Sequence, residues 1–324
     1  MVLDERSSEE PGRVVVGVDG SDAARAALVW GIRAAAQRGA RVEAVSAFPV
    51  DFYWTDAYVL DRPRADDART ATESRTRALV DDVRGDPAVL AVPGGGDVPV
   101  EVVAAAGPAA EQLIDRSQDA ELLVVGSRGR GAVAGALLGS VSLRCVMHAR
   151  CPVVVVHGAV APAAGSSTVV VGVDGSPSAR AALATAAQEA RRFGDRLRVV
   201  TAFRTADTWS DVPELLELTA AELRSAASSM ATTEVADVLG AGPAQVPVDV
   251  VAVEGPPVEV LVGQAAHADL LVVGSRGHGT LPGLLLGSVA LRAAVRSECP
   301  VMVVHPTGAA AAGDAPARTS AATV

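Results

Sequence analysis

Short β-branched runs alternate with longer alanine-rich stretches along the chain, and the alternation passes through the same cycle twice. Short apolar runs bounded by turn residues are typical of buried strands, whereas apolar residues three and four positions apart indicate an amphipathic helix. Strands are expected at 13–18, 41–47, 98–103, 121–125 and 152–156, and again at 168–173, 196–202, 247–252, 269–273 and 300–304. This alternation predicts βαβ units and a parallel sheet in each half.

The first helix of each half is expected directly after the first strand. Small apolar residues repeat there at helical spacing, as Ala23, Ala27, Trp30 and Ala34 in the first half and Ala182, Ala186 and Ala190 in the second. Ser21 and Ser176 precede these helices, where a serine hydroxyl can accept from a free helical N–H. Pro177 suits a first helical position. Both helices should pack their alanine faces on the sheet.

The two cycles are copies of one another. Val16–Ser21 matches Val171–Ser176 at an offset of 155, whereas Gly107-Pro108 matches Gly255-Pro256 at an offset of 148, so the second copy is seven residues shorter. We therefore expect a first domain over 1–157, with a polar tail at 1–12, and a second domain over 168–306. Residues 158–167 form a small-residue linker, and the alanine-rich tail at 307–324 is expected to be disordered.

Each half carries a glycine-rich turn between its fourth strand and the helix that follows. Gly126-Ser127-Arg128-Gly129, nine residues and Gly139-Ser140 recur as Gly274-Ser275-Arg276-Gly277, nine residues and Gly287-Ser288. Such a turn offers unpaired N–H groups to a phosphate chain. If strands one and four are neighbours, in a 3-2-1-4-5 order, Asp19 and Asp174 at the first strand ends flank the same crevices. Two phosphate-binding crevices are predicted.

These residues resemble the universal stress proteins, specifically their tandem ATP-binding members, over nearly the whole chain apart from the linker and tails. The resemblance implies an α/β fold of two tandem Rossmann-like domains, each an open five-stranded parallel sheet flanked by helices. It implies ATP as the ligand, with Mg²⁺ or Mn²⁺ on its phosphates, and a regulatory stress-response role. It further suggests that the fifth strands pair across a two-fold, which the two halves of one chain could satisfy, leaving another surface for a homodimer.

The resemblance also assigns residues to the nucleotide. Asp19 with Ala47, and Asp174 with Ala202, would contact its adenine and ribose end. The triphosphate would lie against Gly126, Arg128, Gly129, Gly139, Ser140, Val141 and Ser142 in the first half, and against Gly274, Arg276, Gly277, Gly287, Ser288 and Val289 in the second. Ala290 replaces Ser142. A lost hydrogen bond to a charged group is worth roughly 1.5 to 3 kcal/mol, so weaker binding is expected in the second half.

Ordinary structural roles compete with these assignments. Aspartates before glycine are common turn residues, serines at helix starts are common caps, and most arginines are solvated. Their repeat beside the glycine turns favours a ligand. Trp54 and Trp209 follow the second strands and could stack on adenine, although covering the core is the commoner role. His157 and His305 end equivalent strands without a second metal-binding residue nearby, and we interpret them as structural.

Composition narrows the possibilities further. Among 324 residues the net charge is -10, which argues against nucleic acid as a partner. The chain contains no lysine, so a Walker-type P-loop and Schiff-base chemistry are excluded. An acidic start lacks the pattern of an export signal, no stretch is suited to a membrane, and three cysteines are too few for a disulfide framework. A cytoplasmic location is expected.

Three functions remain open at this point. The first is a nucleotide-binding regulator whose conformation or association changes with ATP. The second is an enzyme, at most a slow ATP hydrolase with no assigned catalytic residue. A dehydrogenase is disfavoured because the second strand ends in Ala47-Phe48 without an acidic residue for the ribose. The third is an assembly module in which nucleotide is only structural.

Overall fold

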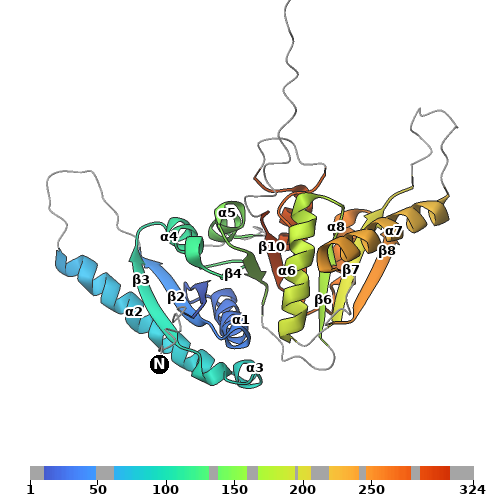
Figure 1. Ribbon diagram of the computed structural model, residues 1–324. Helices are drawn as coiled ribbons and strands as arrows, with labels where there is room; N and C mark the ends of the chain where they lie inside the picture. Colours follow the sequence, from blue (N-terminus) through green and yellow to red (C-terminus); the bar gives the residue numbers. More distant parts are fainter. Residues whose placement is uncertain are drawn as a thin grey trace, which may run out of the picture.

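The computed structural model describes residues 11–48, 62–130, 138–158, 167–193, 196–205, 219–240, 246–278 and 285–306. Within these ranges both halves contribute to one ten-stranded sheet, in the order β3-β2-β1-β4-β5-β10-β9-β6-β7-β8 (Figure 1). Each half therefore has the predicted 3-2-1-4-5 order, with parallel neighbours inside the half. The α/β, Rossmann-like architecture predicted from the sequence is confirmed.

The strands follow the valine-rich runs closely. They are β1 (Arg13–Gly17), β2 (Arg41–Phe48), β3 (Val100–Ala106), β4 (Leu122–Gly126) and β5 (Val153–Val156), then β6 (Thr168–Gly172), β7 (Arg196–Phe203), β8 (Val248–Glu254), β9 (Leu270–Gly274) and β10 (Val301–Val304). The third strand of each half begins and ends later than predicted. It starts after Pro99 or Pro247, which have no N–H to donate to a ladder, although their carbonyls still accept from the neighbouring strand.

Helices cover both faces of the sheet. One face carries α1 (Asp22–Arg38), α2 (Arg62–Arg84), α6 (Pro177–Phe193) and α7 (Ala220–Leu239), and the other carries α4 (Ala109–Arg116), α5 (Ser140–His148), α8 (Pro257–Gln264) and α9 (Ser288–Arg296). Short helical turns lie at α3 (Pro87–Leu90), η1 (Gly95–Asp97) and η2 (Ser117–Asp119). Because side chains alternate along a strand, Val14 and Val16 join the core under the first set, whereas Val15 joins the core under the second.

The predicted helix starts are confirmed. The hydroxyl oxygen of Ser21 accepts from the N–H of Ala24 at 3.2 Å, and that of Ser176 accepts from the N–H of Ala179 at 3.2 Å. Each cap satisfies one of the N–H groups that a helix start leaves without an intrahelical partner. The caps thereby hold α1 and α6 immediately beyond the ends of β1 and β6, where the predicted sites lie.

The two halves meet at the middle of the sheet. β5 and β10 pair antiparallel, with Met302 opposite Val154, so neither forms a free sheet edge. Beside this pair, α1 and α6 approach one another (Figure 1). The side chains of Arg38 on α1 and Glu189 on α6 are each only 2% exposed and form an ion pair across the junction. The halves therefore share a core as well as a sheet.

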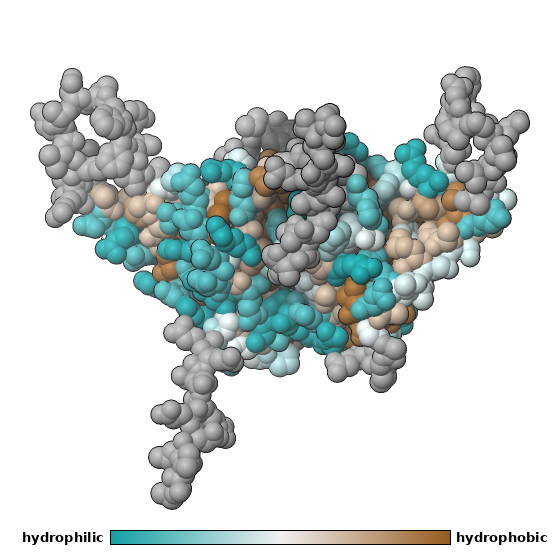
Figure 2. Space-filling model, turned by 45° about the horizontal axis from the view of Figure 1, so that its top comes forward, coloured by the Kyte–Doolittle hydropathy of each residue, from teal (hydrophilic) through white to brown (hydrophobic). Residues whose placement is uncertain are grey.

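Much of the face in Figure 2 is hydrophilic, with apolar residues in smaller areas. Cys145, Cys151 and Cys299 are free and buried. None of the helices in the described ranges combines the length and apolar character needed to cross a bilayer. Trp54, Trp209, the central part of the linker and the tail at 307–324 lie outside the described residues.

Candidate functional site

Two cavities lie at the carboxyl ends of the central strands, one in each half. The first, of about 520 Å³, opens beside β1 and β4, and the second, of about 390 Å³, beside β6 and β9. In both halves this is the point where the strand order reverses, the usual place for a ligand in an open α/β sheet. Every residue that the sequence analysis assigned to nucleotide lines one of these cavities. The fold thus brings each predicted set together.

The aspartates tie the first strand of each half to the glycine turn. Oδ1 of Asp19 accepts from the N–H of Ser21 at 2.9 Å and from its hydroxyl at 2.6 Å, while Oδ2 accepts from the N–H of Arg130 at 2.9 Å. Asp174 accepts in the same way from the N–H of Ser176 at 3.0 Å and of His278 at 3.3 Å. Each carboxylate fixes the loop and also lines its cavity, so its role in the turn does not remove it from the cavity wall.

The glycines of the motif have different structural roles. A Cβ on Gly126 would lie 2.7 Å from the carbonyl carbon of Ala23, so this glycine lets α1 pack against the end of β4. A Cβ on Gly129 would overlap Oδ2 of Asp19. At Gly139 the nearest atom to an added Cβ is 3.4 Å away, which is close to ordinary contact. Gly129 and its counterpart Gly277 are therefore the positions at which a side chain would displace the aspartate.

The start of α5 supplies the N–H groups of the first cavity. No side chain caps Gly139, and the first bond of the helix is donated by the N–H of Leu143 to the Gly139 carbonyl at 2.9 Å. The N–H groups of the three residues between them, 140–142, lie in the first turn, where a helix has no acceptor of its own. The N–H of Gly139 itself is used, because it donates to the Ser127 carbonyl at 2.8 Å. The N–H groups left available to an anion are therefore those of the first helical turn, not that of Gly139.

Ser142 has a role that the sequence did not reveal. Its hydroxyl donates to the Gly126 carbonyl at 2.6 Å, and its side chain is buried against the turn. A hydroxyl has one proton, so this bond leaves it none to donate to a phosphate oxygen. At the equivalent place Ala290 is 1% exposed. Replacement by alanine therefore removes a hydrogen bond within the loop and not a bond to phosphate. Weaker nucleotide binding in the second half does not follow from it.

Ala47 and Ala202 contribute through their main chain. The N–H of Val18 donates to the Val45 carbonyl at 2.8 Å, which shows that Val45 faces β1. Alternate residues of a strand face the same neighbour, so the N–H and C=O of Ala47 point to the same side, where β1 has already ended. The bond from Val173 to Val200 places Ala202 identically. A donor and an acceptor are thus presented together at each cavity wall.

Charged groups at the cavity mouths differ between the halves. Arg128 is exposed and Arg276 half-buried, and neither forms an ion pair with another described residue. The guanidinium of Arg130 lies over Gly20, whereas the imidazole of His278 lies over Gly175. The offset of 148 relates Arg130 to His278, so the repeat in the sequence could have revealed this pair of positions. No group of three potential metal-binding side chains occurs among the residues that the structure describes.

Both halves of the chain match a known protein family. The family model described as "Universal stress protein family" matches residues 11–157 and again residues 166–305. The chain belongs to the universal stress protein family. Two universal stress proteins of Mycobacterium tuberculosis are 37% and 36% identical over 297 and 299 residues, each match covering 90% of this chain and 96% of the relative. The relatives share the tandem length.

A solved structure shows the same architecture. The crystal structure of a universal stress protein from Archaeoglobus fulgidus DSM 4304 superposes with a TM-score of 0.62 over 92% of this chain and 97% of that one, at 20% identity. At this identity the likeness concerns the fold alone. The universal stress protein fold accounts for the tandem parallel sheets with helices on both faces. The ligand has to be argued from the cavities of this chain.

Proposed function

We propose that each half binds one ATP, with a divalent cation on its phosphates, and that occupancy changes the conformation or association of this stress-response protein. The observation that supports the proposal is that a carboxylate, a strand-end main chain and a helix start line each of two cavities. Adenine would meet the N–H and C=O of Ala47 or Ala202. The triphosphate would lie at the first turn of α5 or α9, where the helix dipole favours negative charge.

The surrounding side chains fit this orientation. Val18, Val45 and Leu113 line the first cavity and provide apolar contacts for a base. Arg128 lies between the two glycines and can neutralise part of the phosphate charge. Both oxygens of Asp19 already accept hydrogen bonds. A divalent cation would therefore be held largely by phosphate oxygens and water, as Mg²⁺ commonly is.

A regulator is favoured over an ATP hydrolase. Hydrolysis needs a group that positions or deprotonates water. Among the described residues that line the first cavity, Asp19 is the one carboxylate, and the loop N–H groups fix it in place. Since β5 and β10 pair within the chain, a homodimer would use another surface. We place this activity in the cytoplasm, in keeping with three free cysteines.

Mass analysis of nucleotide released from the purified, denatured protein tests the proposal. We expect ATP, at up to two molecules per chain after incubation with ATP and Mg²⁺. Gly129→Val and Gly277→Val should each remove one equivalent, because the new side chain would displace the aspartate. Gly263→Ala is the matched control, since an added Cβ there meets nothing within 4 Å. A protein that takes up no adenine nucleotide, or unchanged stoichiometry in both valine variants, would contradict the proposal.

The regulatory part needs a separate measurement. Sedimentation velocity with and without ATP should show a change in sedimentation coefficient that the double variant G129V/G277V lacks. The same samples, assayed for released phosphate, test the hydrolase alternative. Binding without a change in shape or association would favour a purely structural role for the nucleotide.

A further inference from the structure

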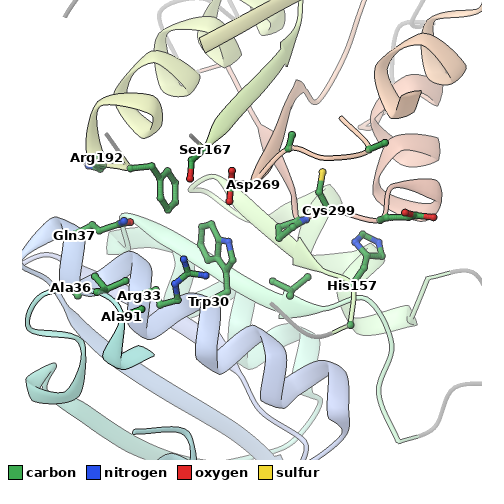
Figure 3. A pocket seen from close by; sticks show the side chains of 18 of the residues that line it. Trp30, Arg33, Ala36, Gln37, Ala91, His157, Ser167, Arg192, Asp269 and Cys299 are labelled. Atoms are coloured by element: carbon green, nitrogen blue, oxygen red, sulfur yellow. The ribbon is translucent and has the colours of Figure 1, made fainter. Parts of the chain in front are cut away.

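A third cavity lies between the two halves, apart from both nucleotide cavities (Figure 3). Its volume is about 650 Å³, larger than either of the others. One wall is α1 of the first half, with Trp30, Arg33 and Gln37. The opposite wall comes from the second half, namely the end of α6 and the starts of β6, β9 and β10. A ligand here would contact both halves at once.

Three residues that line this cavity carry a buried polar atom without a hydrogen-bond partner within the described ranges. Nε of Arg33, Oε1 of Gln37 and Nδ1 of His157 are buried and have no hydrogen-bond partner among the described residues. Nε2 of His157 donates to the Ala294 carbonyl at 2.7 Å, which holds the ring at the cavity wall. Buried polar groups without partners are unusual and costly, so this junction is not optimised for stability alone.

Arg33 provides a positive charge without a counterion at ion-pair distance in the described part of the chain. Burial lowers the pKa of its guanidinium, against the smaller opposing effects of Asp269 and Asp86. A guanidinium remains protonated at neutral pH and binds a carboxylate in a planar, bidentate geometry. This end of the cavity therefore suits one carboxylate group.

Negative charge on the opposite wall limits the number of negative charges that the ligand can have. Asp269 uses Oδ2 to accept from the N–H of Thr168 at 3.0 Å, and Glu298 is exposed at the rim. A ligand with several negative charges would be repelled by these two carboxylates. A cationic amino group facing Asp269 would be attracted instead.

Aromatic rings complete the lining. Trp30 and Phe193 lie with their ring centroids 6.4 Å apart and their planes tilted by 55°. In Figure 3, Trp30 and Arg33 extend from α1 toward Asp269 and Ser167 across the cavity. Trp30 is only 3% exposed, so an apolar body held between the charged ends would contact mainly the half-buried ring of Phe193.

The residues of α1 that line the cavity have no chemically similar counterparts at the equivalent positions of α6. The offset of 155 relates Arg33 to Gln188, which is exposed, and Trp30 to Thr185, whose hydroxyl donates to the Ala181 carbonyl of its own helix. The charged and aromatic groups are thus not a by-product of repeating one domain.

We propose that this cavity binds a small zwitterion with an apolar body, of which a free aromatic or aliphatic amino acid is the simplest example. Its carboxylate pairs with Arg33, its amino group faces Asp269, and its side chain lies against Phe193. Because such a ligand bridges the halves, its binding stabilises their junction and raises the melting temperature.

Three probes that share a phenyl ring separate the contributions. L-phenylalanine carries both charges, 3-phenylpropionate only the carboxylate and phenethylamine only the amine. We expect L-phenylalanine to raise the melting temperature of the full chain in a dose-dependent way, and to bind at least tenfold more tightly than the other two in calorimetric titration. Equal binding of 3-phenylpropionate would overturn the zwitterion assignment, and no response to L-phenylalanine would overturn the site.

Variants locate the binding. Arg33→Gln, which introduces the residue type found at the equivalent position on α6, and Asp269→Asn should each weaken L-phenylalanine binding at least tenfold. Arg41→Gln is the matched control, because Arg41 pairs with Glu101 on the far side of the first half. Far-UV circular dichroism and a cooperative melt establish that each variant is folded. Undiminished binding in folded Arg33→Gln would refute the proposal, and ATP stoichiometry reports independently on the nucleotide sites.

Discussion

The ion pair between α1 and α6 should be one of the most sensitive points of the molecule. Glu189 lies between two arginines, with Oε2 at 2.5 Å from Nη2 of Arg38 and Oε1 at 2.7 Å from Nη1 of Arg192. The side chains of Glu189 and Arg38 are each 2% exposed, whereas that of Arg192 is 33% exposed. Removing the carboxylate leaves the buried guanidinium of Arg38 without a counterion, whereas Arg192 can turn to solvent.

The cost of Glu189→Gln follows from this burial. Breaking a buried pair by removing one partner typically costs about 3 to 5 kcal/mol, because the remaining charge is left uncompensated. Glu121, at 3.8 Å from Nε of Arg38, is too far to accept a hydrogen bond from it and reduces this cost only in part. We expect the lower end of the range, about 3 kcal/mol, in the free energy of unfolding.

Urea unfolding followed by tryptophan fluorescence is the assay, since Trp30 lies at the junction beside Phe193. In the double variant R38M/E189L both charges are gone, and replacing a buried pair by apolar residues is often nearly neutral, so most of the lost stability should return. Asp249→Asn is the control, because its partner Arg198 is 34% exposed and such pairs contribute about 1 kcal/mol or less. A loss of unfolding free energy in Glu189→Gln no larger than in Asp249→Asn would refute this prediction. A double variant less stable than Glu189→Gln would refute it as well.

Further predictions concern the glycine turn and buried ionisable groups. Gly126→Ala should lose about 1 to 3 kcal/mol of unfolding free energy in urea, because its Cβ would overlap the α1 backbone, whereas Gly139→Ala should change little. Burial raises the pKa of Glu234 above its usual 4.5. Native Glu234 thus binds its proton more tightly than the unfolded chain does, so its contribution is present below about pH 4.5 and is lost as pH rises. Glu234→Gln should consequently stabilise the protein at pH 7 more than at pH 4, and equal effects would contradict this. Burial lowers the pKa of His157 and His305 below 6.5. Stability should therefore fall as pH drops below about 6.5, and less steeply in H157Q/H305Q; identical pH profiles would show that neither histidine is responsible.

Local patterns in the sequence predicted the strands, the start of the first helix in each half, and residues that line each candidate cavity. Apolar runs predicted every strand within about three residues at either end. The central strands, such as β4 and β9, are unbroken apolar runs because both of their faces are buried. Ser21 and Ser176 marked helix starts through bonds that span only three residues. Strand order then placed Asp19 beside the glycine turn, since the carboxyl ends of parallel neighbours meet at one edge.

Only the tertiary structure shows which hydrogen-bond and ion-pair partners these residues have. Ser142 and Gly126 are 16 residues apart, and only the packing of α5 on β4 shows that the hydroxyl proton is already engaged. Arg38 and Glu189 are 151 residues apart and belong to different halves. The repeat itself cannot predict their pairing, nor the cavity of Arg33 and Asp269, because both form where the copies differ. Burial and partnership across a junction depend on the relative placement of two domains, which local sequence does not encode.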